Sequence, residues 1–254
     1  MRGAVPPGWL WTMALIAYDR ADAAAFQATR HLGGDALAAW RDAITRHLDP
    51  RPGMRLLDLG CGTGSWTAAF RAWWPGTGVV AVEPSAAMRE RAVAGPILAG
   101  HAADLPVADA SVDAVWLSTV IHHVADLPAA AREIRRVLRP GAPVLIRSVF
   151  PGRHEGITLC RFWPETITAL NTAYPSVAAI EEAFGCPAAA LEPVPQVSAP
   201  SLAEAAAGLR REAHTLLRLI SDEAWAAGLE RLHAAAAQET GPQVDTLDLL
   251  VLRP

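Results

Sequence analysis

The stretch Leu56-Leu57-Asp58-Leu59-Gly60-Cys61-Gly62-Thr63-Gly64 constrains the fold more than any other part of this chain. Residues 56–59 are apolar except for one carboxylate and follow the turn-forming pair Pro52-Gly53, which predicts a buried parallel strand. Three glycines at alternate positions then allow a sharp turn and the close approach of a ligand to the backbone. Residues 65–74 predict a helix whose free N–H groups point at that ligand. The pattern therefore predicts a nucleotide-cofactor loop.

Two common phosphate-binding signatures do not match this loop. The third glycine of the dinucleotide fingerprint G-x-G-x-x-G would fall on Ser65 or Thr67, depending on the register. The phosphate-loop signature needs a Lys, and none follows Gly64; the whole chain contains Arg but no Lys. The remaining pattern, D-x-G-x-G-x-G, resembles the first motif of the class I S-adenosylmethionine-dependent methyltransferases. That cofactor carries no phosphate, which agrees with a loop that lacks Lys.

Composition limits the class of protein. A chain of 254 residues with 52% hydrophobic content is long enough for one α/β domain with inserts. The formal net charge of −4 argues against a nucleic-acid surface, and no apolar run has the length of a membrane span. Three cysteines without a C-x-x-C pair indicate a reducing compartment and no structural zinc. We predict a cytoplasmic protein with a small-molecule substrate and no nucleic-acid or membrane partner, and its oligomeric state stays open.

The N-terminal residues admit two interpretations. Arg2 followed by the apolar run 8–17 is typical of a secretion signal, but Pro6-Pro7 and two Trp in the run argue against one. We therefore expect an apolar extension, with Met13 as an alternative start. Residues 1–48 are predicted to form this extension and lid helices, with an amphipathic helix over 35–48.

A second strand is predicted over residues 78–85, and it carries Glu83 near its end. An acid about twenty residues past the glycine loop can accept hydrogen bonds from both ribose hydroxyls. A carboxylate that caps an apolar strand also needs a partner. The resemblance implies that Pro84 and Met88 pack on the adenine, although Met88 could equally fill the core.

Further motifs extend the resemblance. Residues 100–106 are similar to the family segment G-D-A-x-x-L-P, in which the acid bonds the adenine amino group; here His101 stands in that place. A neutral His can still accept this hydrogen bond, and Ala102 would contribute its backbone N–H. Tyr18 is either a residue that closes over the cofactor or an ordinary surface residue. The resemblance implies cofactor contacts from Tyr18, Asp58, Gly60, Cys61, Gly62, Thr63, Gly64, Glu83, Pro84, Met88, His101, Ala102 and Ser118.

Two adjacent histidines follow the predicted strand 111–118. The family signature S-x-D-x-V…H-H-V matches this segment, and it places His122 and His123 near the carboxyl end of a strand, where open α/β sheets bind ligands. Neighbours on a helix diverge by about 100°, so His123 is the preferred catalytic candidate and His122 the second. The alternative is a pair that only packs and hydrogen-bonds. A metal is not expected, because Thr119 and His122 replace the acids of the related E-x-x-E-H motif.

The later part of the chain predicts a fifth strand over 144–150, a helix over 175–185 and a closing strand over 247–252. The resemblance implies a doubly wound, Rossmann-like α/β fold with a seven-stranded, mostly parallel sheet and helices on both faces. Residues 49–254 would form this cofactor-binding domain. Inserts at about 152–174 and 200–240 would form a helical cap and build the substrate pocket.

The resemblance implies transfer of a methyl group from S-adenosylmethionine to an O-, N- or C-nucleophile on a small molecule. A base at His122, His123 or His154 could remove the acceptor proton. The alternative is a protein of the same fold that binds the cofactor as a scaffold or catalyses a rearrangement without methyl transfer. A nicotinamide oxidoreductase is disfavoured because the dinucleotide fingerprint fails.

Overall fold

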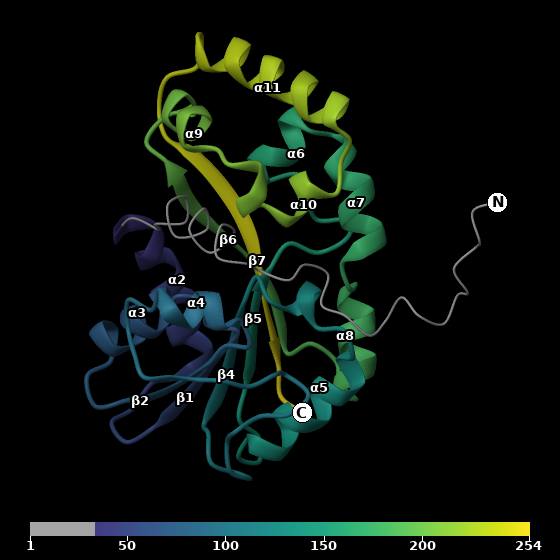
Figure 1. The fold of residues 1–254 in the computed structure, drawn as a ribbon. Helices are drawn as coiled ribbons and strands as arrows, with labels where there is room; N and C mark the ends of the chain where they lie inside the picture. The colour runs from purple at the N-terminus through teal and green to yellow at the C-terminus, as the bar shows by residue number, and fades with distance from the viewer. Residues whose placement is uncertain (1–33) are drawn as a thin grey trace, which may run out of the picture.

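The computed structural model describes residues 34–254, which form a sheet with helices on both faces and a helical cap at one end (Figure 1). The described residues contribute seven strands in the order β3-β2-β1-β4-β5-β7-β6. The first five in this order are parallel, whereas β7 runs antiparallel to both β5 and β6. The predicted Rossmann-like, mostly parallel sheet is confirmed. The strands are β1 Arg55–Leu59, β2 Gly78–Val82, β3 Ile97–Leu98, β4 Ala114–Ser118, β5 Val144–Ser148, β6 Ala190–Ala199 and β7 Gln243–Leu252.

Each face of the sheet has its own core. The first core packs Ile134 and Ile180 of two helices against the sheet, and the second does the same with Trp40 and Phe70. The inner strands β4 and β5 are buried almost throughout, which explains their continuous apolar runs. The helices on the two faces are α2 Gly34–Leu48, α3 Ser65–Trp73 and α4 Ala86–Glu90, then α5 Leu127–Val137 and α8 Val177–Phe184.

Local sequence fixes where the face helices begin and end. The carboxylate of Asp126 accepts a hydrogen bond from the N–H of Ala129 and starts α5. The hydroxyl of Ser176 caps α8 in the same way, and Gly185 ends that helix with φ of 63°. The prediction of a helix over 175–185 is correct to within two residues at each end.

The two predicted inserts pack together as one helical cap. Its core joins Phe162 and Trp163 of the first insert to Leu217 and Leu232 of the second. Because β7 is antiparallel to β5 and starts directly after the cap, the cap lies at the carboxyl ends of the parallel strands (Figure 1). The cap consists of α6 Thr158–Phe162, α7 Glu165–Ala173, α9 Leu202–Gly208, η2 Arg211–Ala213, α10 Thr215–Arg218 and α11 Asp222–Ala236. The domain boundary at residue 49 stays a prediction.

Strand β6 was not predicted from the sequence. Pro193 and Pro195 interrupt its pattern, and proline cannot donate a hydrogen bond to a neighbouring strand. The structure places β6 at the edge of the sheet, where proline is tolerated and also blunts pairing with other chains. Three predicted strands were too long: β2 ends at Val82, β4 begins at Ala114 and β5 ends at Ser148. The predicted closing strand was too short, because β7 begins at Gln243. Within residues 34–254, no helix combines the length and apolar character needed to cross a bilayer.

Candidate functional site

The glycine loop follows β1 and has a backbone that glycine alone adopts readily. Gly60, Gly62 and Gly64 have φ of 69°, 58° and 84°. A Cβ on Gly60 would lie 2.6 Å from a methyl carbon of Val120, and a Cβ on Gly64 would lie 2.8 Å from the carbonyl oxygen of Ala94. Close packing therefore requires glycine at these two positions. Gly64 also precedes α3, and no side chain caps that helix, which leaves its first N–H groups available to bind a ligand.

Glu83 lies one residue past β2 and joins two loops. One carboxylate oxygen accepts a hydrogen bond from the N–H of Gly62 at 3.0 Å, and the other accepts one from Ser85 at 2.8 Å. Burial raises the pKa of Glu83, and these two hydrogen bonds oppose that rise. An ionised carboxylate has about four acceptor positions, so about two are left for the hydroxyls of a ligand.

Asp58 lies beneath the loop rather than on its surface. Its side chain is buried, and the hydroxyl of Thr67 on α3 donates a 2.6 Å hydrogen bond to it. Burial, reinforced by the charge of Glu83 and opposed by the Thr67 hydrogen bond, raises the pKa of Asp58 to about 7. Asp58 therefore ties β1 to α3 and supports the loop from below.

The raised pKa of Asp58 predicts a pH-dependent stability. Between pH 3.8, the ordinary pKa of an Asp side chain, and about pH 7, the folded protein holds a proton that the unfolded chain has lost. Stability must therefore fall as the pH rises through this window. Asp58→Asn removes the titration, so its free energy of unfolding should improve relative to wild type by up to about 4 kcal/mol between pH 4 and 8. Urea denaturation across this range measures the difference.

A matched control for this prediction is Asp104→Asn. Asp104 is an exposed carboxylate on a neighbouring loop, so its removal should leave the pH dependence of stability unchanged. Burial also raises the pKa of Glu83, so both wild type and Asp58→Asn keep a pH dependence from that residue. If Asp58→Asn and wild type gave parallel stability curves from pH 4 to 8, Asp58 would not be the protonated group.

The other predicted loop residues lie around the same turn. Cys61 and Thr63 are buried, and the carbonyl of Thr63 accepts a hydrogen bond from Val93. Burial raises the pKa of the Cys61 thiol, so the thiol stays protonated and is a poor nucleophile. Pro84 is exposed, whereas Met88 is 3% exposed and contributes mainly to the interior. Tyr18 lies outside the described residues.

His101 and Ala102 lie on the loop after β3, beside the end of β2. The backbones of His101 and Asp104 exchange two hydrogen bonds, which close a tight turn. Gly100, the residue before this turn, packs against Val82, since an added Cβ would lie 3.1 Å from a Val82 methyl carbon, so the turn lies next to Glu83. His101 is exposed and Ala102 is half-buried, which leaves both accessible to a ligand.

The predicted histidine pair lies on η1 Ile121–His123, at the carboxyl end of β4. The expectation that the two rings diverge was wrong, because this short 3-10 turn brings their centroids to 4.2 Å. His122 is buried and stacks at 3.9 Å on the ring of Tyr174, which comes from the end of α7. His123 is less buried than His122. Among the described residues no three His, Cys, Asp or Glu side chains are close enough to hold a metal ion.

Sequence reasoning missed a polar cluster next to Ser118. The Arg147 guanidinium donates hydrogen bonds to the hydroxyl of Ser118 at 3.2 Å and to Gln196 at 2.7 Å. It also lies 4.9 Å from the Trp40 ring and 5.6 Å from the Trp66 ring. Arg147 is only 6% exposed, and an Arg inside the apolar run of a predicted strand was the one available signal. Tyr174 was also missed.

The site lies within a segment that matches known proteins. The sequence model of the methyltransferase domain family matches residues 57–146, from β1 to β5 and through the glycine loop, Glu83 and the histidine pair. Residues 57–146 are therefore similar to a methyltransferase domain. The domain is similar to a malonyl-[acyl-carrier protein] O-methyltransferase of Erwinia pyrifoliae, with 34% identity over 57% of this chain and 55% of the relative.

Two further relatives agree with this family. A demethylmenaquinone methyltransferase of Corynebacterium kroppenstedtii is 35% identical over 56% of this chain and 57% of its own length. The chain thus spans a little over half the length of these curated relatives. The crystal structure of a putative methyltransferase from an antibiotic biosynthesis pathway of Anabaena variabilis superposes with a TM-score of 0.62. That structure is 22% identical and covers 86% of this chain and 97% of its own, so it supports the α/β fold of this chain.

Proposed function

We propose that this protein binds S-adenosylmethionine at the glycine loop and transfers its methyl group to a small-molecule acceptor. The observation that carries the proposal is the hydrogen bond between Glu83 and the N–H of Gly62 at 3.0 Å, within the matched domain. This hydrogen bond brings the carboxylate of Glu83 next to the glycine loop, where the glycines have no side chains to block a ligand. When bound, the cofactor supplies a methyl group on a sulfonium, which is activated for in-line displacement.

The described residues suit the parts of this cofactor. The remaining acceptor positions of Glu83 match two ribose hydroxyls, and the open backbone at Gly60, Gly62 and Gly64 accommodates a group without steric conflict. The turn of His101 and Ala102 offers a ring nitrogen and a backbone N–H to the adenine. No part of this arrangement requires a phosphate, which agrees with a loop that has no Lys.

The protein's own contribution to the reaction is alignment and proton removal. Holding acceptor and methyl donor in line can lower the barrier by up to about 7–11 kcal/mol. A neutral His123 would accept the proton of a hydroxyl or amine acceptor, which adds on the order of 10²–10⁴-fold. Tyr174 fixes His122 by stacking, so the buried His122 supports the more exposed His123. The relatives' names differ in their acceptors, so the acceptor of this chain stays open.

Methyl transfer is tested with methyl-labelled S-adenosylmethionine and an extract of small metabolites. We expect a labelled product together with an equal amount of S-adenosylhomocysteine. The Gly62→Val variant is the inactive control. If the protein binds the cofactor but no label moves to any acceptor, the alternative of a scaffold or a non-methylating enzyme would be favoured.

The role of His123 predicts a specific pH profile. With the labelled acceptor found above, the rate of wild type should rise through about pH 6–7, where an ordinary His loses its proton. His123→Gln should flatten this rise and slow the reaction, whereas the affinity for S-adenosylhomocysteine should change little. His233→Gln, on the exposed face of α11, is the matched control. Full activity of His123→Gln across this range would assign the residue a structural role.

A further inference from the structure

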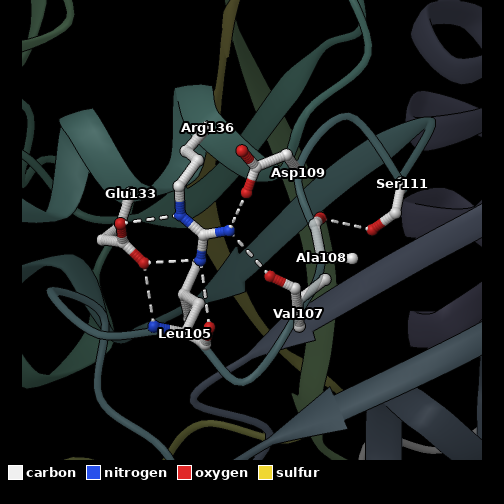
Figure 2. A network of polar contacts seen from close by, with 7 residues as sticks. All are labelled: Leu105, Val107, Ala108, Asp109, Ser111, Glu133 and Arg136. Atoms are coloured by element: carbon white, nitrogen blue, oxygen red, sulfur yellow. Dashed lines mark hydrogen bonds and ion pairs between the residues drawn. The ribbon is translucent and has the colours of Figure 1, made fainter.

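Arg136 of α5 uses all five of its N–H donors inside one compact network (Figure 2). Its Nε and one Nη donate to the two carboxylate oxygens of Glu133 at 2.9 and 2.8 Å. The remaining donors reach the carbonyl of Val107 at 2.9 Å, the carboxylate of Asp109 at 2.5 Å and the carbonyl of Leu105 at 3.1 Å. The fork shape of a guanidinium is what allows one side chain to reach all four partners.

Glu133 closes this network from the other side. One carboxylate oxygen of Glu133 accepts a 3.0 Å hydrogen bond from the N–H of Leu105. Because Arg136 also donates to the carbonyl of Leu105, both backbone groups of Leu105 are held. The hydrogen bonds from Arg136 lower the pKa of Glu133 to about 2, which keeps the pair ionic at neutral pH. Leu105 and Val107 are buried in the core beneath. The loop from 105 to 109 is thus fixed to α5 by both polar and apolar contacts.

The same loop carries the turn of His101 and Ala102. Gly100 packs so closely on Pro106 that an added Cβ would lie 2.5 Å from the proline ring. The residues on either side of the turn therefore have little freedom once Leu105 is held. Gly100 also packs against Val82, the residue before Glu83, since an added Cβ would lie 3.1 Å from a Val82 methyl carbon. The fixed loop therefore forms one wall of the site next to the glycine loop.

We propose that Arg136 is a positioning residue that holds the His101–Ala102 turn in place to recognise the base of the cofactor. This inference rests on the proposed function, since it requires an adenosyl ligand at the glycine loop. Arg136 lies on α5 and acts only through the loop. Its loss should reduce selectivity for the base more than it reduces binding of the rest of the ligand.

Base selectivity is measured by titrating the full chain with S-adenosylhomocysteine and with S-inosylhomocysteine, in which a carbonyl replaces the 6-amino group. We expect wild type to prefer the adenosyl ligand by about tenfold or more, the scale of one or two hydrogen bonds. Arg136→Met should reduce this preference to about threefold or less. Arg136→Lys should not restore it, because a single ammonium cannot reproduce the fork.

The matched control is Arg135→Met. Arg135 is the neighbouring residue on α5, and its guanidinium donates to the carbonyl of Phe184 at 2.7 Å, at the end of α8. Its loss should lower the melting temperature but leave the preference for the adenosyl ligand at the wild-type value. Should Arg136→Met not fold, Glu133→Gln weakens the same hydrogen-bond network to a smaller extent. This variant should reduce the preference for the adenosyl ligand to an intermediate value.

Three outcomes separate this inference from the proposed function. If wild type binds neither ligand, the proposed function fails, and this inference fails with it. If wild type binds both ligands equally, the loop does not recognise the base and the inference is overturned. If Arg136→Met and Glu133→Gln keep the wild-type preference, the network of Arg136 and Glu133 only stabilises the fold. The inference is then overturned, while the proposed function stands.

Discussion

Replacing Gly62 by Val is expected to abolish detectable binding of S-adenosylmethionine. Gly62 has φ of 58°, and a left-handed backbone costs other residues about 1–2 kcal/mol, with β-branched ones at the upper end. Relaxation of that strain moves the N–H of Gly62 away from Glu83 and loses a hydrogen bond to a charged group, worth about 1.5–3 kcal/mol. The displaced loop then no longer presents its backbone to the ligand, so we expect a loss of affinity of about 100-fold or more. Calorimetric titration with S-adenosylhomocysteine measures the loss.

The control for Gly62→Val is Gly53→Val. Gly53 has φ of 86° in the turn before β1, and no atom lies within 4 Å of an added Cβ. It therefore carries comparable backbone strain at a position away from the ligand, and its affinity should equal that of wild type. Circular dichroism should show both variants folded. Unaltered affinity in folded Gly62→Val would contradict the assignment of the loop.

Replacing Glu83 by Ala is expected to weaken binding by about 10- to 150-fold in Kd. The proposed contact of Glu83 to the ribose would be worth about 1.5–3 kcal/mol, the range for a hydrogen bond to a charged group. The effect should reach the upper part of this range, because the N–H groups of Gly62 and Ser85 lose their acceptors as well. Both loops that form the site are then less well held.

Glu83→Gln refines this prediction. The amide keeps one acceptor oxygen, but its NH₂ group must face the N–H of either Gly62 or Ser85. We therefore expect an affinity between those of wild type and Glu83→Ala. Asp104→Ala, which removes an exposed carboxylate nearby, should leave Kd unchanged. An affinity of Glu83→Ala within about twofold of wild type would mean that Glu83 only supports the loops.

Local sequence was sufficient to predict the strand, the glycine turn and the helix at the centre of the candidate site. The apolar run of β1, the three glycines and the first residues of α3 are adjacent in the chain, and each has a direct conformational meaning. Glu83 was also predictable, because an acid directly after a buried strand is unusual. The strand, the glycine turn and the helix were predicted correctly because each depends on neighbouring residues alone.

The remaining parts depend on residues that are distant in sequence. Trp40 and Gln196 are 156 residues apart, yet the Trp40 indole donates a 2.8 Å hydrogen bond to the Gln196 side chain. The stacking of His122 on Tyr174 likewise joins the sheet to the cap. Glu133 and Arg136 are three residues apart and share one face of α5, but their ion pair was not predicted, and nothing local indicated the loop that it holds.

The most direct test of the central claim is calorimetric titration of the full chain with S-adenosylhomocysteine and, separately, with NAD. The glycine loop and Glu83 predict saturable binding of S-adenosylhomocysteine at one site per chain, competed by S-adenosylmethionine and unaffected by NAD. Saturable binding of NAD, without binding of either S-adenosyl ligand, would contradict the account.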